Sequence, residues 1–138
     1  MFTATRRIEI EFGDCDPAGI VYYPNYFRFF DDATAHLLEN ALGMKKRDWI
    51  ERYGIAGIPA VDTGAKFLRP SRFGDEVTIE STIVELGRSS FSVRHKLRNG
   101  DAVAIEAHEV RVWAGRDPLN KDAIKAVALP DEVRNALG

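Results

Sequence analysis

A long apolar segment between Pro24 and Gly43 is the strongest constraint on the fold of this chain. Side chains suited to a core recur there at helical spacing, at Phe27, Phe30, Thr34, Leu37, Leu38 and Ala41. A proline in the first turn loses no intrahelical hydrogen bond, and a glycine commonly ends a helix. Tyr26, Phe29 and Ala33 widen the apolar surface, so we expect a helix that is buried on most of its sides.

Strand-like alternation precedes this helix once and follows it four times. The stretches are 4–12, where Arg6, Ile8, Ile10 and Phe12 share a face, and then 60–69, 76–86, 90–98 and 102–114. Asn99-Gly100 favours a hairpin between the last two. Short helices are expected over 45–53, ending at Gly54, and over 130–137. This order predicts an α+β fold in which a curled antiparallel sheet wraps around one long apolar helix.

Length and composition limit the possible functions. A chain of 138 residues with a hydrophobic fraction of 45% predicts a single domain over 1–138. No stretch reaches the ~20 apolar residues of a membrane span, and no signal peptide is recognisable, so we expect a cytoplasmic protein. The net charge of −2 argues against nucleic-acid or membrane partners. Cys15 is the only cysteine, which excludes an intrachain disulfide.

The segment EFGDCDPAGIVYYPNY places two aspartates just before the long helix. Asp14 and Asp16 suit a turn, because a carboxylate accepts hydrogen bonds from nearby backbone N–H groups. Asp16 also suits chemistry, since the start of a helix offers free N–H groups and a positive pole. Ile20 to Tyr23 add apolar walls. A carboxylate, an oxyanion-binding pole and an apolar cleft together favour acyl transfer from a thioester, in which Asp16 attacks the carbonyl or activates water.

This segment resembles the signature of the 4-hydroxybenzoyl-CoA thioesterases, which are hotdog-fold acyl-CoA thioesterases. The resemblance is nearly continuous from Ile8 to Arg28 and returns at 52–61, 90–95 and 108–114. It implies a hotdog fold and an enzyme that hydrolyses an aromatic acyl-CoA to the free acid and CoA. It also implies a homo-oligomer, a dimer or tetramer, with the active site between subunits. We expect no cofactor.

The resemblance further implies roles for individual residues. Asp16 falls at the catalytic aspartate, as nucleophile or general base. The backbone N–H that polarises the thioester carbonyl falls at Tyr23. Asp31 falls at the aspartate that meets the ring hydroxyl of the acyl group, from a neighbouring subunit. Arg88 and Ser90 fall in the region that binds the CoA part of the substrate.

Two departures from the family pattern concern the substrate. Where the family has three adjacent basic residues, this chain reads Gly87-Arg88-Ser89. Lys66, Arg69, Arg72 or Arg94 are other candidates for holding the CoA phosphates. Phe27 and Ile58 replace a family histidine and threonine, which predicts a more apolar acyl pocket.

Other functions can be weighed against this hypothesis. Asp14-x-Asp16 also resembles the start of some Mg²⁺-dependent phosphotransferases, but Ala18 stands where these have Thr or Val. A short-chain aliphatic acyl-CoA thioesterase and a non-catalytic acyl-binding protein remain alternatives on the same fold. Cys15 has no histidine near it in sequence, so we expect a small packed side chain. His36, His95 and His108 lack metal-binding spacing, so we expect no metal site and assign them to the surface or to satisfied core positions.

Overall fold

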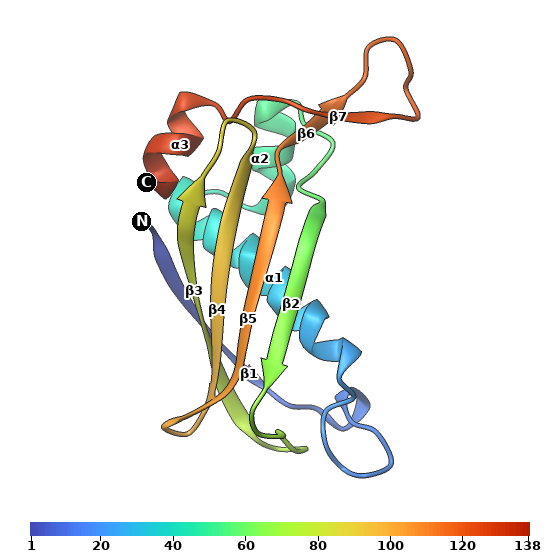
Figure 1. The fold of residues 1–138 in the computed structure, drawn as a ribbon, viewed down its shortest axis with the longest axis vertical. Coiled ribbons are helices and arrows are strands. Elements are labelled where there is room, and N and C mark those ends of the chain that lie inside the picture. Colours follow the sequence, from blue (N-terminus) through green and yellow to red (C-terminus); the bar gives the residue numbers. More distant parts are fainter.

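The structure is a computed structural model that describes residues 1–138. Its elements are labelled in Figure 1. In chain order they are β1 (Thr3–Glu9), a 3-10 turn η1 (Phe12–Asp14), α1 (Pro24–Leu42), α2 (Lys46–Tyr53), β2 (Ala60–Phe67), β3 (Glu76–Leu86), β4 (Ser90–Asn99), β5 (Ala102–Val112), β6 (Ala114–Arg116), β7 (Ile124–Ala126) and α3 (Asp131–Leu137).

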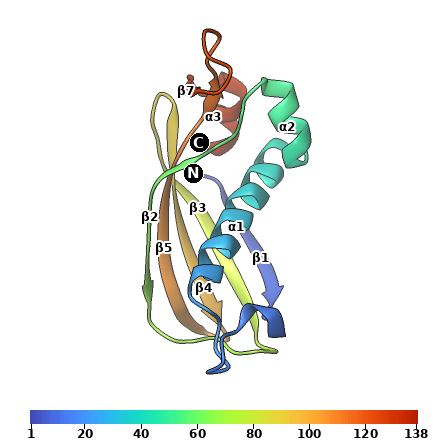
Figure 2. The same ribbon diagram turned by 90° about the vertical axis from the view of Figure 1, so that its right-hand side faces the viewer.

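Five strands form one antiparallel sheet in the order β1–β3–β4–β5–β2. The sheet curves, and α1 lies across its inner face (Figure 2). The shorter helices α2 and α3 lie at the end of the sheet where α1 finishes (Figure 1). This arrangement confirms the predicted α+β class and the hotdog layout. β2 pairs only with β5, so it leaves one free backbone edge.

The core between α1 and the sheet has two parts along the helix. The first half of α1 contributes Tyr26, Phe29 and Phe30 to a cluster with β1, β3, β4 and β5. The second half packs with α2, α3 and the stacked rings of Trp49 and Trp113, whose centroids lie 5.8 Å apart. The first cluster matters for function, because it fixes the start of α1 and the loop before it.

The limits of α1 agree with the prediction. Pro24 occupies the first turn, and Gly43 ends the helix in the left-handed region with φ 69. Its burial is less complete than expected, because Arg28, Asp31 and Asn40 are exposed in the single chain. Neither α1 nor any other helix is long and apolar enough to cross a membrane.

Three strand predictions ran too far, of which the one over 60–69 ends at Phe67 as β2. β1 ends at Glu9, and the chain then turns into η1, so the side chain of Phe12 is 79% exposed instead of sharing the inner face with Ile10. β5 ends at Val112, and the hairpin β6–β7 that follows was not predicted. Its three-residue strands are too short for alternation to be recognised.

The β4–β5 hairpin is confirmed, with a small difference in its turn. Asn99 pairs with Ala102, so the two turn residues are Gly100 and Asp101 instead of Asn99 and Gly100. Gly100 has φ 64, which favours glycine at that position. The predicted short helices are present as α2 and α3, and α2 is followed by Gly54 in the left-handed region.

Candidate active site at the start of α1

The segment from Asp14 to Tyr22 is a closed loop that leads into α1. The backbone N–H of Tyr22 donates to the carbonyl of Asp14, and that of Asp16 donates to the carbonyl of Ile20, both over 2.9 Å. Gly19 at the tip has φ 80, a conformation that glycine adopts without steric cost. Since both limbs are joined by hydrogen bonds, the loop holds Asp16 in a defined place before the helix.

Asp14 is a structural residue of this loop. Its carboxylate is buried and accepts hydrogen bonds from the Glu11 N–H (2.8 Å) and from the Arg28 guanidinium (2.9 Å). Its carbonyl oxygen also accepts a hydrogen bond from the Asn25 side chain (2.8 Å). The interpretation of Asp14 as a turn residue is therefore confirmed.

Asp16 differs from Asp14 in having a free carboxylate oxygen. Its Oδ1 accepts a hydrogen bond from the Ala18 N–H over 2.9 Å, which is the local turn contact that the sequence suggested. No protein group donates to Oδ2. The side chain is half-buried, so this oxygen is available to a ligand while the other oxygen fixes its orientation.

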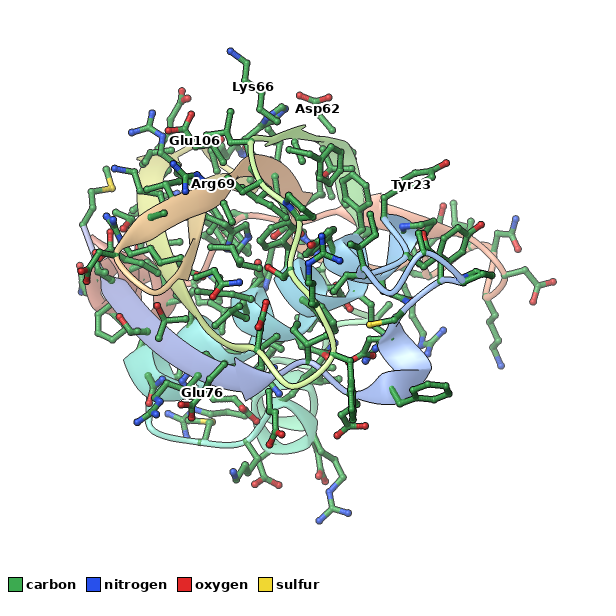
Figure 3. All side chains as sticks on the ribbon, turned by 90° about the horizontal axis from the view of Figure 1, so that it is seen from below. Tyr23, Asp62, Lys66, Arg69, Glu76 and Glu106 are labelled. Atoms are coloured by element: carbon green, nitrogen blue, oxygen red, sulfur yellow. The ribbon has the colours of Figure 1, made fainter.

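Tyr23 is the residue from which α1 begins. Because Pro24 has no N–H, the first donor at this helix end is the Tyr23 N–H, and it donates to no protein atom. Helix starts favour negative charge for this reason. Tyr23 is 61% exposed, and its side chain projects away from the body of the molecule (Figure 3). The backbone at Tyr23, and not its side chain, therefore provides the oxyanion-binding feature.

An apolar crevice of about 320 Å³ lies beside this helix start. Arg69 is the one charged residue in its lining. The aromatic and aliphatic part of the lining consists of Ile20, Val21, Tyr23, Tyr26, Phe67 and Leu68. A flat or apolar acyl group could lie here next to the free N–H.

Asp31 lies two turns into α1, on its exposed flank. Its Oδ1 accepts a hydrogen bond from Arg111 Nη2 of β5 over 2.7 Å, and no protein group donates to its Oδ2. The Asp31 side chain is 52% exposed, whereas that of Arg111 is only 7% exposed. Asp31 thus presents one free carboxylate oxygen at the surface, held from behind by a buried cation.

Asp31 is the exposed end of an otherwise buried set of polar side chains that we call the polar network. Its members come from α1, β3, β4 and β5, and they are Asp31, Thr34, Ser81, His95, Glu109 and Arg111. Glu109 is its centre. Its Oε2 accepts from Arg111 (2.6 Å), while its Oε1 accepts from His95 Nε2 (2.9 Å) and from the Thr34 hydroxyl. Ser81 Oγ lies 2.7 Å from His95 Nδ1.

The contacts within the network shift the pKa values of Glu109 and Arg111 in the directions that keep these two side chains charged. Burial by itself raises the pKa of Glu109, but hydrogen bonds from His95, Arg111 and Thr34 outweigh it, so the pKa of Glu109 lies below its ordinary value. Burial lowers the pKa of Arg111, yet its bonds to Glu109 and Asp31 raise it on balance. The buried pair is therefore ionised at neutral pH.

The polar network was not predicted from the sequence. A signal existed, because alternation through 102–114 places Glu109 and Arg111 on the same face as the apolar Ile105 and Ala107. Two charged residues facing a core indicate a buried pair. The interpretation of His95 as a satisfied core group is confirmed, since it is fully buried between two partners.

Arg88 and Ser90 lie far from Asp16 within one chain. They belong to the turn from β3 to β4, at the end of the sheet opposite the start of α1 (Figure 1). β3 has 11 residues, so the two ends are separated by roughly 35 Å. The Arg88 side chain is exposed, and its carbonyl accepts a hydrogen bond from the Leu129 N–H (2.9 Å).

The other basic candidates lie on different surfaces. Arg69 lines the apolar crevice, whereas Lys66 and Arg94 line a hollow on the outer face of β2, β4 and β5. Figure 3 shows the Lys66 side chain pointing away from the sheet. Arg69 lies beside the start of α1, and Arg72 pairs through its backbone with Ile20 of the loop that precedes it.

Phe27 and Ile58, which were both expected to line the acyl pocket, lie in different parts of the structure. The Phe27 ring lies edge-on to that of Phe67, with centroids 6.3 Å apart, so it extends the aromatic surface near the crevice. The Ile58 side chain is buried in the core with Trp49 and Trp113, and its carbonyl accepts a hydrogen bond from Arg111 Nη1 (3.0 Å). In the single chain Ile58 therefore contributes to packing.

Comparison with known proteins places this geometry in a family. Residues 10–137 match the model of the thioesterase-like superfamily. The 4-hydroxybenzoyl-CoA thioesterase of Pseudomonas sp. strain CBS-3 is 38% identical over 132 residues, which are 91% of each chain. A 1,4-dihydroxy-2-naphthoyl-CoA hydrolase of Thermosynechococcus vestitus is 33% identical over 70% of this chain and 66% of its own.

Solved structures agree along the full length. An Asp-to-Asn mutant of 4-hydroxybenzoyl-CoA thioesterase, complexed with 4-hydroxybenzoyl-CoA, superposes with a TM-score of 0.88 at 34% identity and covers 100% of both chains. A gentisyl-coenzyme A thioesterase superposes with a TM-score of 0.83 at 34% identity over 98% of this chain and 100% of its own. The shared fold and sequence establish that this chain belongs to the thioesterase-like superfamily of hotdog proteins, together with 4-hydroxybenzoyl-CoA thioesterase.

Proposed function

We propose that this protein hydrolyses the thioester of an aromatic acyl-CoA, with Asp16 and the Tyr23 N–H as its catalytic groups. The observation that carries the proposal is that a free carboxylate oxygen on the closed loop and a free backbone N–H on the residue after the loop both occur at one helix start. The relatives named above act on aromatic acyl-CoA esters by their descriptions, and they support the aromatic class.

The chemistry follows from these two groups. The Tyr23 N–H and the positive pole of α1 stabilise the negative charge that develops on the thioester oxygen. Asp16 Oδ2 either attacks the carbonyl carbon, which expels the CoA thiolate and leaves an anhydride for water to cleave, or takes a proton from the water that attacks. Heavy-oxygen label in the Asp16 peptide, after a single turnover in labelled water, would identify the covalent route.

The active form in this proposal is a homo-oligomer of the domain 1–138, a dimer or tetramer, in the cytoplasm. Arg88 and Ser90 lie too far from Asp16 of their own chain to share a ligand readily with it. A neighbouring copy could supply Arg88 and Ser90 for the CoA part and Asp31 for the acyl ring. The free edge of β2 and its exposed Val61, with Phe67 and Leu68 at its end, are available for such a contact.

The decisive experiment compares two isosteric substitutions. Asp16→Asn keeps the turn contact to the backbone but removes the charged oxygen, and we expect thiol release from an aromatic acyl-CoA to fall by at least about 100-fold. Asp117→Asn is the matched control, because Asp117 Oδ1 accepts a similar contact from the Leu119 N–H (2.9 Å) in the distant β6–β7 loop. Equal rates in wild type and Asp16→Asn would overturn the assignment of Asp16.

A second candidate function is hydrolysis of short aliphatic acyl-CoA esters. It is favoured by the apolar lining of the crevice beside Tyr23 and by the Phe27–Phe67 contact. A panel of aryl and alkyl CoA esters distinguishes the two by kcat/KM. Binding of the panel without any thiol release would instead identify an acyl-binding protein on this fold.

A further inference from the structure

We propose that Arg111 is a positioning residue for the acyl group of the substrate. It fixes the Asp31 carboxylate so that Asp31 Oδ2 faces outward and accepts a hydrogen bond from a ring hydroxyl. This inference rests on the proposed function, since an aromatic ring must reach Asp31. It extends that function by naming the residue that sets the preference for hydroxylated rings.

The guanidinium of Arg111 is held by three acceptors. Its Nη2 donates to Asp31 Oδ1 (2.7 Å) and to Glu109 Oε2 (2.6 Å), while its Nη1 donates to the Ile58 carbonyl (3.0 Å). A planar guanidinium with acceptors on two of its nitrogens has a fixed orientation. A lysine ammonium at this position has no such planar fork and would hold Asp31 less rigidly.

Glu109 connects Arg111 to the buried side chains of the core. Both of its oxygens are occupied, Oε2 by Arg111 and Oε1 by His95 and Thr34. His95 is fully buried and stacks on the Phe30 ring with centroids 5.0 Å apart. Every side chain that links the sheet interior to Asp31 is therefore buried.

The free oxygen of Asp31 determines which ring substituent it favours. An ionised carboxylate only accepts hydrogen bonds, so it attracts a hydroxyl donor and repels a second carboxylate. Arg111 lies directly behind it and is almost fully covered. If Asp31 is removed, the cation becomes the group that the ring meets.

The first test measures the ratio of kcat/KM for 4-hydroxybenzoyl-CoA to that for benzoyl-CoA. We expect Asp31→Ala and Arg111→Lys each to lower this ratio about tenfold, the effect of losing one charged hydrogen bond. The double variant should lower it no further, because both changes remove one interaction. Arg7→Lys is the matched control and should leave the ratio unchanged, because Arg7 Nη2 donates to Glu76 Oε1 (2.6 Å) on the exposed surface.

Two results would overturn the inference. One is a folded Arg111→Lys protein with the wild-type ratio. The other is a double variant in which the two losses multiply, since Arg111 would then act independently of Asp31. Absence of thiol release from every ester would instead overturn the proposed function and, with it, this inference.

A second test does not require a change at the buried Arg111. Asp31 is half-exposed, so Asp31→Ala should fold. It should turn over 4-carboxybenzoyl-CoA at least about tenfold better than the wild type does, because the uncovered guanidinium pairs with the ring carboxylate. No gain for this ester in Asp31→Ala would show that Arg111 does not lie behind the acyl ring.

Discussion

The loop before α1 and the polar network beneath Asp31 hold carboxylates by opposite means. In the loop, Asp14 and Asp16 are oriented by groups close in sequence, such as the Glu11 and Ala18 N–H groups. In the network, Asp31 is oriented by Arg111, which lies 80 positions away. The local contacts of Asp16 leave one of its carboxylate oxygens free for a ligand. The long-range contacts of the network bury the Arg111 guanidinium, which in turn holds one oxygen of the surface residue Asp31.

This difference has a physical consequence for folding. Most hydrogen bonds of the loop join groups within the loop, and these can form early; one further backbone bond, from the Val21 N–H to the Ser71 carbonyl (2.9 Å), comes from the segment before β3. The network exists only when α1, β3, β4 and β5 have come together, and until then its charges are solvated. Its stability therefore depends on all partners being present, since a buried charge without its partner costs more than the pair contributes.

The largest expected effect comes from removing the central charge of the network. Glu109→Gln leaves the Arg111 cation buried with a weaker partner, and we expect the free energy of unfolding to fall by about 3–5 kcal/mol. Urea denaturation followed by circular dichroism measures it. Glu106→Gln on the exposed face of the same strand is the control and should change it by less than about 0.5 kcal/mol. Equal losses would show that the network adds no special stability.

These same properties decide what the sequence could reveal. Pro24 and Gly43 set the limits of α1 locally, and the turn role of Asp14 depends on neighbours, so both were predictable. The pairing of Asp31 with Arg111 was not. Alternation indicates that Glu109 and Arg111 face inward, but periodicity does not say which helical residues they meet.

The site itself was predictable only in part. The residues around the loop indicated Asp16 as a candidate, and the resemblance added Tyr23 and Asp31. The structure adds that the Tyr23 N–H donates to no protein atom. The distance between Arg88 and Asp16 could not be read from sequence, because it depends on the direction and length of β3. The hairpin β6–β7 was not predicted, because its three-residue strands are too short to show an alternation of apolar and polar residues.

A substitution in the loop should lower the free energy of unfolding less than a substitution in the network does. Asp14→Ala removes the acceptor for the Glu11 N–H and the partner of Arg28, and we expect a loss of about 1–3 kcal/mol in the free energy of unfolding. We also expect a lower kcat with Asp16 intact, because the loop that holds Asp16 loosens. Asp122→Ala, in the exposed β6–β7 loop, is the control. Unchanged kcat would mean that Asp14 does not help to hold Asp16.

The stability that Glu109 contributes to the network should depend on pH. The pKa of Glu109 is lowered in the folded protein, so its contribution is fully present above the ordinary value of 4.5 and is lost as the pH falls through the folded value. The stability difference between wild type and Glu109→Gln should therefore shrink below pH 4.5, by at most about 1.4 kcal/mol per pH unit. Urea titrations from pH 7 downward measure it. A constant difference would mean that the pKa of Glu109 is the same in the folded and unfolded chain.

The smallest effect concerns the backbone of the loop. Gly19 has φ 80 and open space around it, so Gly19→Ala should cost only the strain of a left-handed residue, about 1 kcal/mol. Gly13 has equally open space without a positive φ, so Gly13→Ala is the matched control and should be neutral or slightly stabilising. Thermal unfolding of both variants separates backbone strain from crowding. If the two substitutions lower the stability equally, the shape of the loop would not depend on the backbone conformation of Gly19. The contrast between a loop held mainly by local contacts and a network held by long-range contacts would then not apply to the loop.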